Sequence, residues 1–290
     1  MKKNLSPTYI FGLTWQTVRS NYWRHFGVIL GIFIIYLIIS LLITGLTLGS
    51  TLLNLQAIQE AQATGNLEEL MANAYGGSLG GLLLNFVFSL VLNVTLTALL
   101  VGYAIDTVKN RYAGFGVLFS RYLNWHNILN LLVFLLIIYF VVFAPFLILM
   151  VIIYALAGVT VGFISMIILL ILLIFVLLRL TLTPYYIVDK KMDFINAISA
   201  SWNSLAGNTL SLFLFILLII LLALALIIAL VLIVYILGQA GNVGGVLAVI
   251  IVILGYLFGL LTIEMLELFG FAHYYAELSD TVTEELNENT

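Results

Sequence analysis

The chain has 290 residues, of which 64% are hydrophobic and only 8% are charged. Soluble domains carry roughly 25% charged residues, so this composition excludes an ordinary water-soluble globule and predicts a surface that meets lipid. The absence of cysteine excludes disulfides, thiolate metal sites and a cysteine nucleophile. The net charge of −3 is small, and no nucleic-acid partner is expected.

Hydropathy predicts six transmembrane helices, because about 20 apolar residues are needed to cross a bilayer. The expected spans are approximately 26–49, 79–104, 128–150, 160–181, 209–237 and 245–266. The apolar run from Ile128 to Leu180 is too long for one span, and small residues near Tyr154–Gly162 mark its break. Pro145 should kink the third span. The predicted fold class is an all-α integral membrane bundle, in which residues 1–278 form a single transmembrane domain.

The basic residues predict the orientation. With six spans, all ten lysines and arginines fall on one side of the membrane, and cytoplasmic loops are enriched in these residues. Both ends of the chain are therefore expected in the cytoplasm. The opposite side carries one long external loop, 50–78, whose Glu60, Glu68 and Glu69 are better explained as a solvated face than as a calcium or partner site. Residues 279–290 are expected to form a short, frayed, acidic cytoplasmic tail.

Two segments that precede spans resemble each other. Thr14–Asn21 and Ser201–Asn208 share a tryptophan and a terminal asparagine, and Ser120–Asn127 is a weaker third copy. We therefore expect three units, each an amphipathic cytoplasmic helix followed by a two-span hairpin. Their interface residues are Trp15, Trp125 and Trp202. The aromatic faces should lie in the headgroup region or pack against the bundle's own cytoplasmic ends.

Local signals mark the starts and faces of these helices. Ser6 before Pro7 is a good helix start, and Asp193 is suited to cap the third helix. The predicted aromatic faces comprise Phe11, Trp15, Val18 and Tyr22 in the first helix, Phe115, Phe119 and Tyr122 in the second, and Phe194, Ile198, Trp202 and Leu205 in the third.

From Arg179 to Asn208 the chain reads R-x-x-x-x-P-Y-Y-I-V-D, a short turn, then A-I-x-x-S-W-x-x-x-x-G-N. This resembles a broad group of bacterial polytopic membrane proteins, which includes the membrane domain found with some glycerophosphodiester phosphodiesterases and related families of unknown function. The matching positions are Arg179, Pro184, Tyr185, Ile187, Val188, Asp189, Ala197, Ile198, Ser201, Gly207 and Asn208. The resemblance implies a protein of the bacterial inner (plasma) membrane. It does not imply hydrolysis, because the catalytic domain of the phosphodiesterases is absent.

Three ionisable residues within the spans are candidates for function. Arg179, Glu264 and Glu267 lie near the cytoplasmic ends of the fourth and sixth spans. Arg179 and Glu264 lie at similar depth, so an ion pair that locks the two spans is expected. The alternative is a coupling-ion or proton site that uses Glu264.

A polar ridge and several glycine pairs mark other spans. In the second span Asn85, Ser89, Asn93 and Thr97 recur every fourth residue, which indicates interhelical hydrogen bonding or, alternatively, a polar translocation path. Glycines four residues apart, such as Gly255 and Gly259, favour close helix packing inside the bundle over dimerisation.

No nucleophile, phosphate-loop or metal-binding motif is present, so neither enzymatic activity nor a cofactor or metal is expected. The sequence favours a non-enzymatic scaffold, accessory subunit or envelope factor that lies in the lipid bilayer and binds a protein partner or forms a homo-oligomer. The alternative is a transporter or channel for a lipid or small solute.

Overall fold

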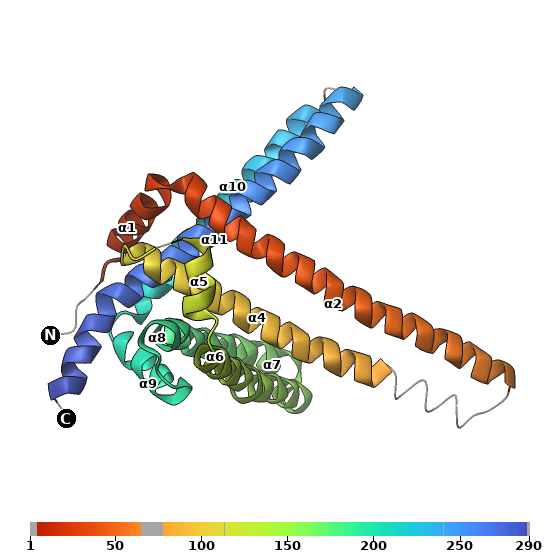
Figure 1. Ribbon diagram of the computed structural model, residues 1–290, viewed down its shortest axis with the longest axis horizontal. Coiled ribbons are helices and arrows are strands. Elements are labelled where there is room, and N and C mark those ends of the chain that lie inside the picture. The colour runs from red at the N-terminus through yellow and green to blue at the C-terminus, as the bar shows by residue number, and fades with distance from the viewer. Residues whose placement is uncertain (1–4, 65–77, 113, 240, 289–290) are drawn as a thin grey trace. The chain divides into compact units, whose positions relative to one another are not determined.

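The computed structural model describes residues 5–64, 78–112, 114–239 and 241–288, and within these ranges every element is a helix (Figure 1). The elements are α1 (Pro7–Ser20), α2 (Tyr22–Thr64), α4 (Ser78–Val108), α5 (Phe115–Tyr122), α6 (Trp125–Ile137), a π-helical segment (Ile138–Phe143), α7 (Ala144–Leu180), α8 (Thr183–Lys190), α9 (Phe194–Ser204), α10 (Thr209–Gly238) and α11 (Gly241–Glu288). The predicted all-α class is confirmed.

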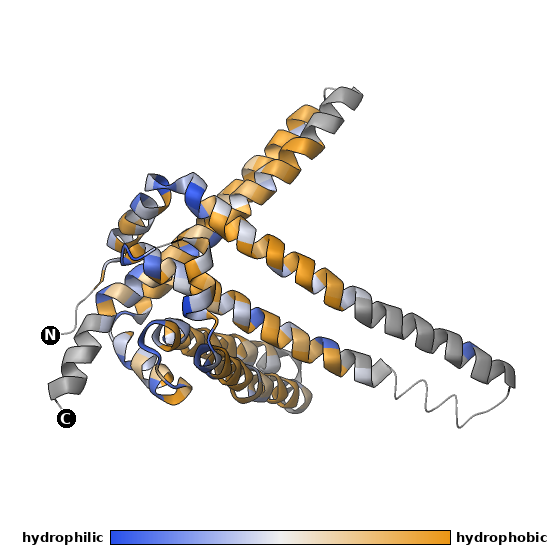
Figure 2. Ribbon diagram, in the orientation of Figure 1, coloured by the Kyte–Doolittle hydropathy of each residue, from blue (hydrophilic) through white to orange (hydrophobic). Residues whose placement is uncertain are grey.

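Six stretches of these helices are long and apolar enough to cross a membrane. They are Tyr22–Gly45, Leu83–Val108, Trp125–Ala155, Gly162–Lys190, Thr209–Leu237 and Val249–Ser279. Each overlaps one predicted span, and Figure 2 shows these helices as mostly hydrophobic, with hydrophilic positions interspersed on α4. Large aliphatic and aromatic side chains on them remain exposed, such as Leu41, Ile171 and Ile253. A protein in water would bury such residues, so this multi-pass chain has lipid as its solvent.

The chain divides into two compact units, one formed by residues 31–97 and the other by residues 1–30 with 98–290. The first and second spans each run through both units. The second unit contains α1, the start of α2, the end of α4, and α5 to α11.

The third and fourth spans form a hairpin, and the chain reverses within the residues of α7. A Cβ on Gly162 would lie 3.3 Å from the Cα of Tyr154. Eight residues of straight helix separate two Cα atoms by about 12 Å, so the chain reverses between these residues. The reversal therefore lies where the break between the two spans is predicted, near Tyr154–Gly162. The π-helical segment ends directly before Ala144 and Pro145, where proline removes a backbone hydrogen bond, and the predicted kink of the third span stays a prediction.

The fifth and sixth spans form the second hairpin of this unit. A Cβ on Gly255 would lie 2.6 Å from Leu230 Cδ2, and one on Gly259 would lie 2.1 Å from Leu226 Cδ2. Because the partners move back four residues as the glycines move forward four, α10 and α11 run antiparallel. These two glycines serve packing inside the chain, as predicted.

Helix extends into two regions that were expected outside the spans. The helix α2 continues to Thr64, so it includes the first part of the predicted loop 50–78 with Glu60, whereas Glu68 and Glu69 lie outside the described residues. The predicted acidic tail 279–290 is helical as far as Glu288, because no glycine or proline interrupts α11 after Gly270.

The helices α1 and α9 begin where predicted, and each predicted aromatic face has a buried member. Asp193 caps α9 by accepting a 3.0 Å hydrogen bond from the Asn196 amide, whereas the Ser6 hydroxyl at the start of α1 bonds to Thr8. The residues buried on the three helices are Ile10, Thr14 and Val18 on α1, Leu118 and Tyr122 on α5, and Ala197, Ala200, Ser201 and Ser204 on α9. Of the predicted faces Val18, Tyr122 and Leu205 are buried, whereas Trp15 and Trp202 are exposed.

Candidate functional site

The ends of the spans meet at one junction of the larger unit. The Tyr22 hydroxyl at the start of α2 lies 2.9 Å from the Thr262 hydroxyl on α11. The Tyr185 hydroxyl on α8 donates a 3.0 Å hydrogen bond to the Leu268 carbonyl on α11. The Leu5 amide likewise donates to Asn208 at the start of α10 over 2.8 Å. Spans that alternate in direction must bring these ends together, and five charged side chains form a cluster here.

Asp106 forms the first half of a charge cluster at this junction. It lies on the last turn of α4, and 1% of its side chain is exposed. Its Oδ2 accepts a 2.7 Å hydrogen bond from Arg121, and its Oδ1 accepts a 2.6 Å bond from the Tyr122 hydroxyl. Arg111 Nε lies 3.4 Å from the same Oδ1. The carboxylate is therefore neutralised by two guanidinium groups and held by a phenol.

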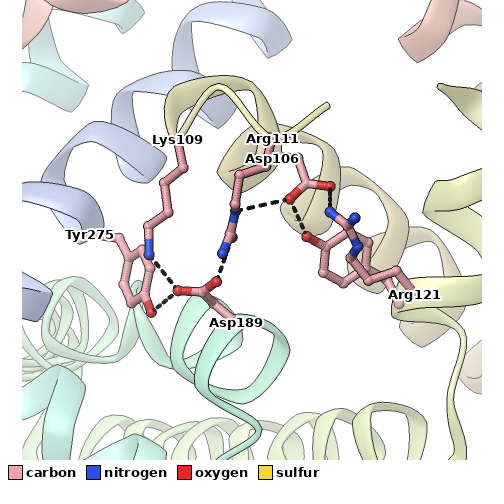
Figure 3. Close-up of polar contacts among 7 residues, drawn as sticks. Asp106, Lys109, Arg111, Arg121, Asp189 and Tyr275 are labelled. Carbon is pink, nitrogen blue, oxygen red and sulfur yellow. Dashed lines mark hydrogen bonds and ion pairs between the residues drawn. The ribbon is translucent and has the colours of Figure 1, made fainter. Parts of the chain in front are cut away.

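Asp189, at the end of α8, forms the second half (Figure 3). Its Oδ2 accepts bonds from Lys109 Nζ at 2.6 Å and from the Tyr275 hydroxyl at 2.7 Å. Its Oδ1 accepts a 2.7 Å bond from Arg111. The Lys109 ammonium also lies 5.1 Å from the centre of the Tyr275 ring, a cation–π contact. With 5% of its side chain exposed, Asp189 is as fully engaged as Asp106.

Arg111 connects the two halves, because its guanidinium contacts both aspartates (Figure 3). The cluster thus ties together the α4 end, α5, α8 and α11, and three cations exceed the two aspartates by one charge. Charge-assisted bonds of this kind are about twice as strong as neutral ones. Removing one partner of a buried pair is costly because it leaves the others unpaired.

Gly102 creates the space for the Tyr122 ring. A Cβ at this position would lie 2.3 Å from Tyr122 Cδ2 and 2.5 Å from its Cγ. The ring therefore packs directly on the α4 backbone. Asp106 lies one turn further along the same face of α4, where it accepts the hydrogen bond from the Tyr122 hydroxyl. Gly102 and Asp106 act together to dock α5.

The cluster shifts the pKa values of its own members. Burial, followed by the hydrogen bond to Asp106, raises the pKa of the Tyr122 hydroxyl well above its ordinary value. Burial alone would lower the pKa of Arg111, but its hydrogen bond to Asp189 and the charge of that carboxylate raise it overall. The neighbouring Tyr122, and then Asp106, raise the pKa of Arg121. All three groups therefore remain donors at neutral pH.

The chain matches no family model, no curated protein and no solved structure. The chemistry of the site is consequently read from its own residues. The motif from which the family resemblance was drawn contributes Asp189 to the cluster and Tyr185 to the junction, so these motif residues have a structural role in this chain.

Arg179 does not pair with the glutamates as expected. Its Nη1 donates a 2.8 Å hydrogen bond to the Trp202 carbonyl, and its guanidinium lies over the rings of Phe175 and Trp202. Glu264 and Glu267 are exposed on α11, and in the described part of the chain neither forms an ion pair with Arg179. Similar depth in two spans does not ensure contact, because each side chain also has to face the other.

The predicted ridge lies on α4, and three hydrogen bonds join its members to groups of the same helix. Ser89 donates to Asn85 Oδ1, Asn93 donates to the Ser89 carbonyl, and Thr97 donates to the Asn93 carbonyl, over 2.9 to 3.1 Å. Each of these three side chains thus has an acceptor within α4. Whether the ridge also faces a neighbouring helix or a polar path stays a prediction.

The three predicted interface tryptophans are exposed. Trp15, Trp125 and Trp202 lie on α1, α6 and α9, all beside the junction where the spans end. Each short helix precedes a long one, as the three-unit plan expects, although the repeat itself stays a prediction. The Trp202 ring contacts Phe175 and Arg179 of α7, whereas Trp125 is 73% exposed, so the choice between the headgroup region and packing on the bundle stays a prediction.

Two histidines belong to the junction instead of to a metal centre. His25 is buried, with Nδ1 2.6 Å from the Tyr103 hydroxyl and Nε2 3.2 Å from the Thr17 carbonyl. His273 Nε2 lies 2.9 Å from the Thr17 hydroxyl. Among the described residues, no three His, Asp or Glu side chains group as metal ligands.

Sequence reasoning missed the charge cluster. The predicted second span ends at residue 104, two residues before Asp106, so this carboxylate was not considered as an intramembrane charge. The dense run of Asp106, Lys109 and Arg111 was the available signal. Its pairing with Asp189 and Tyr275 has no local signature.

Proposed function

We propose that this chain is a non-enzymatic protein of the inner (plasma) membrane that acts as a scaffold, accessory subunit or envelope factor. Its basic junction and both termini face the cytoplasm in this proposal, which accords with the positive-inside distribution of lysine and arginine.

The observation that carries the proposal is that both carboxylate oxygens of Asp106 and of Asp189 are already bound by other side chains. Each carboxylate accepts from a phenol and contacts two cationic side chains. A general base or an ion ligand needs a free lone pair and access to substrate. A carboxylate that is buried and neutralised in this way instead fixes the relative positions of helices.

The exposed groups of the junction suit contact with a partner. Arg111 and Arg121 are each partly exposed while paired, and Trp15 and Trp125 present aromatic rings at the span ends. Arginine and aromatic residues are enriched in protein interfaces. A rigid, cation-rich platform at the membrane surface is therefore supported as a docking surface.

The proposal is tested by amine-reactive crosslinking of intact membranes, followed by purification of the full-length protein. The lysines lie on the proposed cytoplasmic side, so crosslinks there are expected to capture a stoichiometric partner or a defined homo-oligomer. Crosslinking after dilution into detergent serves as the control for chance collisions in the membrane. Recovery of the monomer alone from both preparations would refute the scaffold function.

The alternative, a transporter or channel for a lipid or small solute, is favoured by one observation. Ser89 and Asn93 expose polar side chains within a span of mean hydropathy 2.1. Solute flux or lipid transfer by vesicles that contain only the purified protein would support this alternative.

A further inference from the structure

An apolar groove of about 520 Å³ runs between α7 and α10. Its α7 wall consists of Ile171, Ile174, Phe175 and Leu178, which recur at helical spacing and share one face. Leu210 and Phe213 form the opposite wall on α10. The volume lies within the range of roughly 300–1,000 Å³ that is typical of small-molecule sites.

The groove lies inside the membrane-spanning part of the chain. Its walls belong to the spans Gly162–Lys190 and Thr209–Leu237. From Ile171 to Arg179 the α7 wall measures about 12 Å, close to the roughly 15 Å of hydrocarbon in one leaflet. An acyl chain of a membrane lipid has the length and the chemistry to fill it.

Arg179 closes the groove at its charged end. The guanidinium lies 5.2 Å from the Phe175 ring centre and 5.4 Å from that of Trp202, and its Nε is buried without a hydrogen-bond partner. In the described part of the chain the one acceptor of its hydrogen bonds is the neutral Trp202 carbonyl. A cation at the edge of a span is costly unless it is neutralised, and guanidinium groups match phosphate oxygens in geometry.

The mouth of the groove beside Arg179 has little side-chain bulk. Gly207 lines it with φ of +95°, a backbone conformation that favours glycine, and a Cβ there would meet no atom within 4 Å. Thr209 also lines the groove, and its hydroxyl donates a 2.9 Å hydrogen bond to the Leu205 carbonyl. This leaves room for a headgroup next to the guanidinium.

We propose that the groove between α7 and α10 binds one anionic glycerophospholipid, with an acyl chain along Ile171–Leu178 and the phosphate at Arg179. Basic pockets between transmembrane helices bind anionic headgroups in this way. The site is independent of the scaffold function, because it requires only the fourth and fifth spans and their lipid environment.

The test is native mass spectrometry of the full-length protein in detergent, titrated with dioctanoyl phosphatidylglycerol and with dioctanoyl phosphatidylcholine. The wild type is expected to bind one phosphatidylglycerol at least about fivefold more tightly than phosphatidylcholine. Arg179→Gln should abolish this preference, and Arg179→Lys should retain most of it. Glycerol phosphate, which has no acyl chain, should not compete.

A second variant tests the groove without touching Arg179. Leu210 is 69% exposed, so Leu210→Trp fills the groove with little effect on folding and should weaken binding of both lipids by about fivefold or more. Leu224→Trp, at an exposed position of α10 outside the groove lining, is the matched control and should bind like the wild type. Equal binding of both lipids by the wild type, wild-type binding by Leu210→Trp, or a second copy of the chain crosslinked into the groove would overturn the proposal.

Discussion

Replacing Asp189 with asparagine is expected to lower the free energy of unfolding by about 2–3 kcal/mol. The change keeps the shape of the side chain but removes the charge that neutralises Lys109 and Arg111. Both cations then repel each other at a junction where α4, α8 and α11 meet. The measurement is reversible denaturant unfolding of the purified protein in detergent.

The matched control for this change is Asp193→Asn, four residues further along the chain. Asp193 is exposed and caps α9 through the Asn196 amide, and asparagine caps helices about as well as aspartate. The free energy of unfolding should therefore change by less than about 0.5 kcal/mol. Equal effects of the two substitutions would show that Asp189 is not part of a lock between helices.

Replacing Gly102 with alanine is expected to cost about 1–3 kcal/mol, the usual range for overpacking. The new methyl group would overlap the Tyr122 ring, whose Cδ2 and Cγ lie within 2.5 Å of its position. The ring has to leave the α4 backbone, and its hydroxyl then loses Asp106. Thermal unfolding in detergent measures the loss.

Gly12→Ala is the control for the intrinsic effect of alanine in a helix. Gly12 lies on the exposed side of α1, and a Cβ there would meet no atom within 4 Å. This substitution should raise stability by up to about 1 kcal/mol. If Gly102→Ala acts through the Tyr122 bond, its cost should shrink in a Tyr122→Phe background, since the hydroxyl bond is already absent there. An unchanged cost would contradict this mechanism.

The sequence predicts the spans well because hydropathy and length are one-dimensional properties. All six predicted spans coincide with long apolar helices, and the reversal near Tyr154–Gly162 lies where small residues interrupt the aliphatic run. Lipid permits only helices whose backbone groups bond to one another, so local composition largely determines this level of the fold.

Contacts between segments distant in the sequence are the part that could not be predicted. Asp189 bonds to Lys109, 80 residues before it, and to Tyr275, 86 residues after it. The prediction of an ion pair between Arg179 and Glu264 rests on their similar depth in the membrane. Depth does not specify the direction in which each side chain points. Likewise hydropathy does not show which members of a predicted face are buried, since Val18 and Tyr122 are buried whereas Trp15 is exposed.

We infer that six spans place the basic junction on one side of the membrane and the α10–α11 turn on the other. Because the chain has no cysteine, single cysteines at the exposed positions Lys190 and Gln239 can be labelled without background by a membrane-impermeant thiol reagent. In intact cells Gln239→Cys is expected to react at once, and Lys190→Cys only after permeabilisation. Labelling of both positions from the same side would rule out this topology.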